Sequence, residues 1–124
     1  MGDRLNIEFR FPATFVTGSC RSVHLYSHWD GHYILHGRLQ EALEGARGRW
    51  DDHTYCARII MSQLIRNNWD QNLSWGISPN YTDSEYGELI IHLGPNTVEY
   101  DGRTASFEQV IEEGLPTSDT EALL

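Results

Sequence analysis

The spacing of the apolar residues changes along this chain from the period of a strand to that of a helix and back, and this order constrains the fold more than any other feature. Strict alternation of apolar and polar residues from Leu5 to Phe11 predicts a half-buried strand, which ends at Pro12. Residues 22–27 predict a second strand. The chain therefore begins with two strands that are close enough in sequence to pair antiparallel.

Two helices are predicted next. The first follows a turn at Asp30 and extends to Gly48, with apolar residues at helical spacing at Leu35, Leu39, Leu43 and Ala46. The second can be capped by Asp51 or Asp52 and ends before Asn67, with an apolar stripe made of Cys56, Ile59, Ile60, Leu64 and Ile65. Each helix thus has one apolar face to pack against a sheet.

Strand patterns return in the second part of the chain. Short strands are expected around residues 73–77, 88–93 and 97–100, and a Gly-Pro-Asn turn joins the last two into a hairpin. Ser106 and Gln109 have the spacing of a capping box, in which each side chain binds a backbone N–H of the other residue. This pattern predicts a short final helix.

The resulting order is ββααβββα, which predicts an α+β fold. We expect a mostly antiparallel sheet of four or five strands with two or three helices on one face. A chain of 124 residues has the size of one ordinary domain. We therefore expect a single domain over residues 1–116 and a loose acidic tail over residues 117–124.

Negative charge is concentrated in the second part of the chain. Residues 1–69 contain eight arginines and seven carboxylates, whereas residues 70–124 contain one arginine and eleven carboxylates. Because so little there can neutralise phosphates, we do not expect nucleic acid to bind directly to this part. A basic host protein, itself a nucleic-acid-binding one, is the expected partner, and the candidate residues for its binding are Asp83, Glu85, Glu88, Glu99 and Asp101. In the alternative interpretation, the acidic surface only keeps the protein in solution.

No catalytic signature is recognisable in the sequence. The chain has no lysine, which excludes Schiff-base chemistry, and neither Cys20 nor Cys56 lies in a pattern that would activate a thiol. A binding protein is therefore favoured over an enzyme. No apolar run approaches the roughly 20 residues of a membrane span, and the first residues are not those of a secretory signal. We expect the protein in the cytoplasm of the host cell, and the sequence leaves open whether copies of it form a homo-oligomer.

Residues 24–36 contain four of the six histidines, arranged around a Trp-Asp-Gly turn. Imidazole is the most common metal ligand, so His28, Asp30 and His32 are candidates for a divalent metal site, the one cofactor that the sequence suggests. In the structural interpretation, Asp30 caps the first helix, Trp29 packs, and Gly31 supplies a backbone angle that few other residues tolerate.

A second cluster contains arginine next to tryptophan, at Arg49 and Trp50. A guanidinium and an aromatic plane at the start of a helix suit a phosphate or nucleotide ligand. In the structural interpretation, the neighbouring aspartates cap the helix and pair with the arginines. The candidate residues for a nucleotide site that joins the two clusters are Tyr26, His28, Trp29, Asp30, Arg49 and Trp50.

Three blocks of the sequence resemble a known class of proteins: Leu-Tyr-Ser-His-Trp-Asp-Gly at residues 25–31, residues 49–60, and Trp-Gly-Ile-Ser at residues 75–78. Together, over roughly residues 20–112, they resemble small bacteriophage and prophage accessory proteins of unassigned function. The resemblance implies an inhibitor of a bacterial host factor or defence system, of the anti-CRISPR kind, and the charge distribution adds the expectation that it acts through an acidic surface. The alternatives are a sponge for a nucleotide second messenger and a metal-dependent hydrolase.

Overall fold

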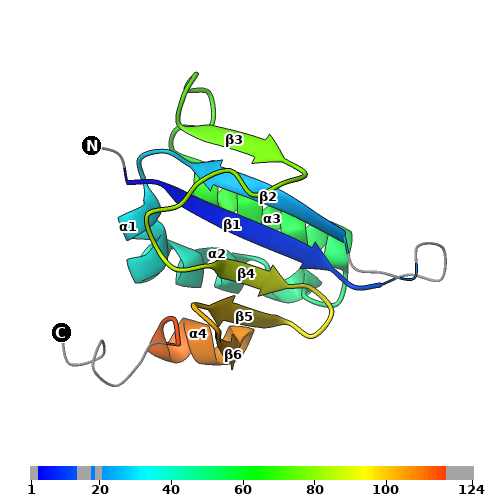
Figure 1. Ribbon diagram of the computed structural model, residues 1–124. Helices are drawn as coiled ribbons and strands as arrows, with labels where there is room; N and C mark the ends of the chain where they lie inside the picture. The colour runs from blue at the N-terminus through cyan, green and yellow to red at the C-terminus, as the bar shows by residue number, and fades with distance from the viewer. Residues whose placement is uncertain (1–2, 14–17, 19–20, 117–124) are drawn as a thin grey trace.

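Six strands form one mixed sheet in the order β3-β2-β1-β4-β5-β6 in a computed structural model, which describes residues 3–13, 18 and 21–116 (Figure 1). The strands are β1 (Leu5–Phe11), β2 (Arg21–Ser27), β3 (Trp75–Ser78), β4 (Leu89–His92), β5 (Thr97–Tyr100) and β6 (Arg103–Ser106). Four of the neighbouring pairs are antiparallel, and β1 pairs parallel with β4. The sheet is therefore mostly antiparallel, as expected.

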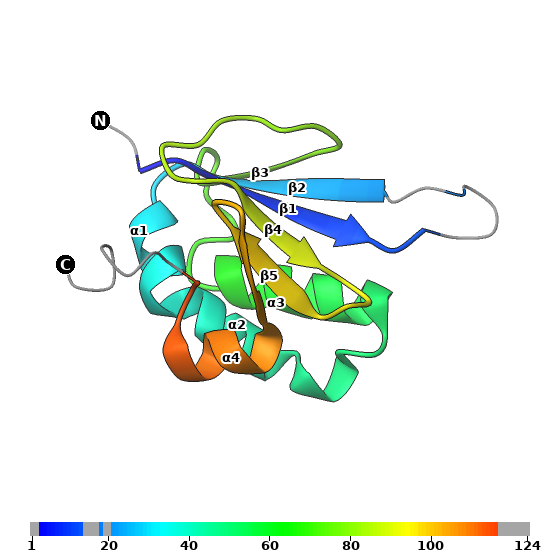
Figure 2. The same ribbon diagram turned by 60° about the horizontal axis from the view of Figure 1, so that its bottom comes forward.

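The helical segments all lie on one side of this sheet, while the loop from β3 to β4 lies on the other side (Figure 2). They are α1 (Gly31–Tyr33), η1 (Ile34–Arg38), α2 (Leu39–Gly45), η2 (Arg47–Arg49), α3 (His53–Ile65) and α4 (Phe107–Glu113). The predicted α+β class, with helices on one face of the sheet, is confirmed. No helix in the described ranges is long and apolar enough to cross a membrane.

Alternation within the central strands builds the core. Leu5, Ile7 and Phe9 of β1 are fully buried, and the parallel register sets Ile7 beside Leu89 and Phe9 beside Ile91. Residues at every second position of a strand share one face of the sheet, so this apolar row meets the helices. The predicted stripe of α3 is confirmed, because Cys56, Ile60 and Leu64 are buried against the same cluster.

The predicted strand count and order are wrong in one respect, because β6 makes a sixth strand. Asp101 and Gly102 have positive φ angles of 52° and 85° and form the turn that leads into it. The segment Arg103–Ser106 lacks apolar alternation, yet its backbone pairs with β5 from Thr97↔Ser106 to Tyr100↔Arg103. This strand is recognised by its backbone pairing with β5. Such pairing does not require alternating apolar side chains, so the sequence pattern did not predict it.

The predicted first helix is interrupted. His36 (φ −111°, ψ 24°) and Gly37 (φ 158°, ψ −42°) leave the helical range, so the chain passes from α1 through η1 into α2. The aspartates expected to cap the two helices occupy the N-cap positions of α1 and α3, but neither the Asp30 nor the Asp52 side chain makes a capping hydrogen bond. The capping box of Ser106 and Gln109 is confirmed at the start of α4. Residues 117–124, expected to form a loose tail, lie outside the described residues.

Candidate functional site

Acidic side chains from three separate segments gather at one end of the molecule, which we call the acidic end. These segments are the loop before β4, the turn between β5 and β6, and the last turn of α4, and the residues are Asp83, Glu85, Glu88, Asp101, Glu112 and Glu113. The Asp101 N–H donates to the Glu88 carbonyl at 2.9 Å, which joins the first two segments. Tyr86 and Tyr100, which adjoin these residues in sequence, line one pocket together with Glu112 and Glu113, which brings the third segment to the same place.

Most of the charge at the acidic end is not neutralised. Arg4 pairs with Asp83 at 3.0 Å and lies 3.5 Å from Glu85. Within the described residues, no ion pair is formed by four exposed carboxylates: Glu88, Asp101, Glu112 and Glu113. Arg103 lies opposite Tyr100 at the same end, and together with Arg4 it leaves this end a surface of net negative charge.

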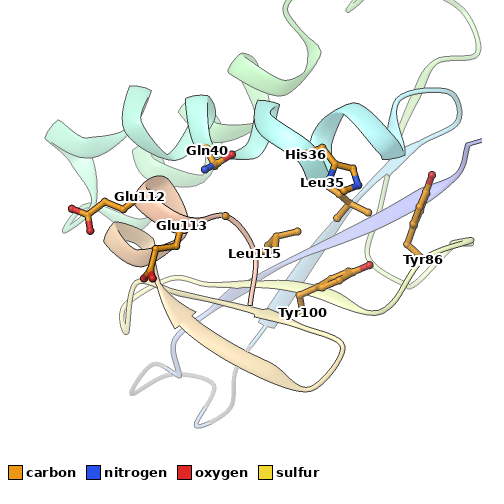
Figure 3. A pocket seen from close by; sticks show the side chains of 9 residues that line it. Leu35, His36, Gln40, Tyr86, Tyr100, Glu112, Glu113 and Leu115 are labelled. Carbon is orange, nitrogen blue, oxygen red and sulfur yellow. The ribbon is translucent and has the colours of Figure 1, made fainter. Parts of the chain in front are cut away.

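A pocket of about 560 Å³ opens in the acidic end, between the helical layer and the end of β5 (Figure 3). Tyr86 and Tyr100 lie on one side of it and Glu112 and Glu113 on the other, with Leu115 between them. The remaining residues that line it are Leu35, His36, Gln40 and Gly114. The carboxylates of Glu112 and Glu113 point away from Leu115 and the tyrosines, so the lining between these two sides is mainly aromatic and aliphatic (Figure 3).

Hydrogen bonds fix the walls of this pocket. Gln40 Nε2 donates to the carbonyls of Val110 and Ile111, both at 3.0 Å, and so joins α2 to the last turn of α4. The Tyr86 hydroxyl donates to the Asp3 carboxylate. This hydrogen bond, with burial, raises the pKa of Tyr86 to about 12, so the hydroxyl stays protonated at neutral pH.

Gly31, from the Trp-Asp-Gly block, makes room for the tyrosine wall. A Cβ at this position would lie 2.8 Å from Cε2 of Tyr86 and 2.8 Å from the carbonyl oxygen of Asp3. Gly31 is not among the glycines with positive φ, so the expectation that it supplies a special backbone angle is wrong. Close packing, and not backbone freedom, explains the glycine.

The predicted acidic residues are not all brought together. Asp83, Glu85, Glu88 and Asp101 lie at the acidic end. Glu99 projects from β5 onto the helix-free face of the sheet, where its carboxylate lies 3.0 Å from Nε2 of His92. It belongs to a separate local pair.

The histidine segment forms a structural corner between β2 and α1. The Tyr26 hydroxyl lies 2.7 Å from Nδ1 of His28, and the His28 ring packs edge-on against Trp29 with ring centroids 4.1 Å apart. The Asp30 carboxylate accepts hydrogen bonds from Arg38 and Asn68, both at 3.2 Å. These bonds hold the corner to η1 and to the turn that follows α3.

The expected metal site is not formed by His28, Asp30 and His32. Nowhere in residues 3–13 and 21–116 do three His, Cys, Asp or Glu side chains group so that they could hold a metal ion. Asp30 is bound to Arg38 and Asn68, while the His32 ring stacks near His36 with centroids 4.5 Å apart. Alternating residues of an extended strand would have converged, but the chain turns into α1 immediately after Asp30.

Arg49 and Trp50 serve packing at the opposite end of the helical layer. Trp50 donates Nε1–H to the Leu43 carbonyl at 2.9 Å and packs edge-on against Phe107, while Arg49 lies over the ring of Tyr55. Figures 1 and 2 show α1 and the end of α2 at opposite ends of one helical run. The histidine corner and the arginine-tryptophan cluster therefore do not combine into one nucleotide site.

The sequence did not predict the pocket residues, because they come from η1, α2, a loop, β5 and α4, which are far apart in the chain. One local feature could have pointed to α4. Glu112 and Glu113 occupy the last turn of a helix, where the partial negative charge of the helix end disfavours carboxylates, and that turn has no basic residue.

Cys56 does not contribute a reactive thiol to this site. The only cysteine in the described part of the chain, Cys56, is buried in the core, and burial raises the pKa of its thiol to about 11. It is therefore protonated at neutral pH and inaccessible to a substrate. Comparison of the chain with protein-family models, with curated proteins and with solved structures finds no match.

Proposed function

We propose that this chain is a binding protein that attaches through its acidic end to a basic surface of a bacterial host protein and thereby inhibits it. The observation that supports this most directly is the group of four exposed carboxylates at the acidic end for which no ion pair is found within the described residues: Glu88, Asp101, Glu112 and Glu113. Such a surface attracts a positively charged partner over long range and disfavours neutral or acidic ones.

The proposed partner is a nucleic-acid-binding host protein, such as the effector of a defence system. Its basic groove neutralises phosphates, and the carboxylates of the acidic end offer charges of the same sign. The Asp101–Glu88 backbone bond and the Arg4 ion pairs keep the acidic loop and turn in place, so little ordering accompanies binding. The resemblance to phage accessory proteins is the reason for proposing inhibition of a host factor in particular.

Charge reversal at the acidic end tests this function. The protein is used to capture partners from a bacterial lysate at low salt, and a captured protein is then purified so that Kd can be measured by calorimetry at two salt concentrations. We expect Glu88→Arg with Asp101→Arg to weaken binding at least tenfold, about 1.4 kcal/mol, and salt to weaken binding by the wild type as well.

The matched control reverses two exposed carboxylates elsewhere, as Asp51→Arg with Asp70→Arg, and should leave Kd unchanged. The partner's own nucleic acid should compete with the wild-type protein. If the acidic-end variant binds as tightly as the control, or if nucleic acid does not compete, the proposed function is wrong.

A further inference from the structure

We propose that two copies of this chain pair through strand β3 to form a symmetric dimer with one continuous sheet. This inference does not depend on the proposed function. Strand β3 lies at one edge of the sheet, and β2 is its neighbour in the described part of the chain (Figure 1). An edge strand has a row of unpaired N–H and C=O groups that can pair with a strand of another chain.

The hydrogen bonding of β3 to β2 shows which backbone groups point to the free edge. The His28 N–H donates to the Ser74 carbonyl at 3.0 Å, so the Ser74 carbonyl points toward β2. Successive residues of a strand direct their N–H and C=O groups to opposite sides. The backbone groups of Gly76 therefore also point toward β2, while those of Trp75 and Ile77 point to the free edge.

These free groups are self-complementary about Gly76. When a second copy of β3 lies antiparallel with the two Gly76 residues opposite each other, Trp75 of each copy lies opposite Ile77 of the other. Each of these pairs exchanges both of its N–H···O=C bonds, and the two glycines form the closer, non-hydrogen-bonded pair between them. A twofold axis through the glycine pair gives the isologous interface that is most common in homodimers.

Gly76 itself is not required by the packing of a single chain. It is not among the glycines with positive φ, and a Cβ there would lie 3.9 Å from the Tyr26 side chain, which is ordinary contact. Glycine weakens the interior of a strand and often marks a place where another backbone approaches closely. The closest backbone approach of the proposed dimer lies at this residue.

The dimer also covers an exposed apolar side chain. Trp75 and Ile77 lie beside Ser27 and Leu25 in the sheet register, which places both side chains on the face that carries the helices. Ile77 is nevertheless 72% exposed, whereas Trp75 packs against the core and donates its Nε1–H to Asn68 at 2.7 Å. Each Ile77 would pack beside the fixed indole ring of the other copy, and an aromatic side chain next to a β-branched one is a favourable cross-strand pair.

The charge distribution allows two like-charged copies to meet at this edge. The net charge of −9 makes copies repel each other, but residues 71–82, which include β3, contain no charged residue. Edge strands that are protected from pairing commonly carry charges. The other edge strand, β6, begins with Arg103 and leads directly into α4. Because β3 and β6 lie at opposite edges, the β5–β6 turn of the acidic end stays accessible in the dimer.

Sedimentation velocity of the full chain over a range of concentrations tests the pairing. We expect the wild type to show a reversible equilibrium of monomer and dimer that shifts toward dimer as salt rises, because salt screens the repulsion between acidic copies. Ile77→Lys should raise the dissociation constant of the dimer at least tenfold. The matched control, Thr104→Lys, introduces the same charge at an exposed residue of β6 and should leave it unchanged.

The circular dichroism spectrum and Tm of each variant show whether it is folded. A wild type that stays monomeric at millimolar concentration would overturn the inference, as is expected if β3 instead pairs with a strand of a different protein. Equal effects of Ile77→Lys and Thr104→Lys would overturn it as well.

Disulfide trapping tests the register of the two strands. In a Cys20→Ser background, Gly76→Cys places two thiols at the closest pair, where Cα atoms about 4.5 Å apart are within the span of a disulfide. Ile77→Cys is the matched control, because the two Cα atoms of residue 77 would be about 8 Å apart, which is too far. We expect mild oxidation to link Gly76→Cys into a covalent dimer and to leave Ile77→Cys unlinked. Linkage of neither variant, or equal linkage of both, would contradict the proposed dimer.

Discussion

Replacing Gly31 by alanine should destabilise the protein through a steric clash that the structure locates. The added Cβ would lie 2.8 Å from the Asp3 carbonyl oxygen, 2.8 Å from Tyr86 Cε2 and 3.2 Å from Leu5 Cβ. The backbone of Asp3 cannot move freely, because its N–H donates to the His28 carbonyl at 3.1 Å and its carbonyl accepts from the Gly31 N–H at 3.0 Å. The clash must therefore displace packed atoms.

Overpacking of this kind costs about 1–3 kcal/mol. Alanine restricts the unfolded chain more than glycine does, which returns about 0.4–1 kcal/mol. We expect Gly31→Ala to lower the free energy of unfolding by about 1.3 kcal/mol, which is the difference between the mid-range values of these two effects. For a domain of this size the corresponding fall in Tm is about 3–10 °C.

The assay is urea unfolding followed by tryptophan fluorescence, together with scanning calorimetry. The matched control is Gly48→Ala, because a Cβ at Gly48 would meet nothing within 4 Å and Gly48 is not among the glycines with positive φ. This control should be unchanged or slightly more stable. If Gly31→Ala proves as stable as Gly48→Ala, close packing does not explain Gly31 and the argument fails.

Three further predictions concern charge and capping. Because the pKa of Tyr86 is raised to about 12, its stabilising hydrogen bond should be fully present below pH 10 and be lost as the pH rises from about 10 to 12. Stability measured against pH should show this loss in the wild type, and its persistence in Tyr86→Phe would contradict the assignment. Ser106→Ala removes the capping box and should cost about 0.5–2 kcal/mol in chemical unfolding, whereas an unchanged midpoint would show that the cap contributes nothing. Glu112→Gln with Glu113→Gln should raise the free energy of unfolding by about 0.3–1 kcal/mol at low salt, since it removes two carboxylates from a helix C-terminus, and a loss of stability would contradict the electrostatic argument.

The sequence predicted those elements whose own residues show the periodicity or capping pattern of a strand or helix. The alternation of Leu5–Phe11, the stripe of α3 and the capping box at Ser106 each report a hydrogen-bonding or packing requirement of a single segment. The parallel pairing of β1 with β4 could not be read in this way, because alternation shows which residues face the core and not which strand lies alongside. The break after Leu35 was missed since the apolar spacing continues through His36 and Gly37.

The candidate site was only partly predictable, because sequence patterns describe single segments and the site joins segments that are far apart in the chain. Composition indicated an acidic surface, and four of the five predicted carboxylates do share one end of the molecule. The pocket is a property of the tertiary fold, because Tyr86 and Tyr100 come from a loop and a strand on either side of β4. The histidine segment attracted attention by its chemistry, but its hydrogen bonds to Arg38 and Asn68 show a structural corner.

The parallel pairing of β1 with β4 also sets the order in which the protein can fold. Strand β1 finds its first neighbour, β2, almost at once in sequence, but its second neighbour begins at Leu89. Closing so long a loop is slow, and until it closes the edge of β1 that pairs with β4 has unpaired N–H and C=O groups, and Ile7 and Phe9 lack their neighbours Leu89 and Ile91. An open strand edge of this kind readily recruits other chains. A nascent or truncated chain that ends before residue 89 should therefore aggregate rather than form a smaller folded unit, which makes synthesis of β4 the step that commits the chain to its native sheet.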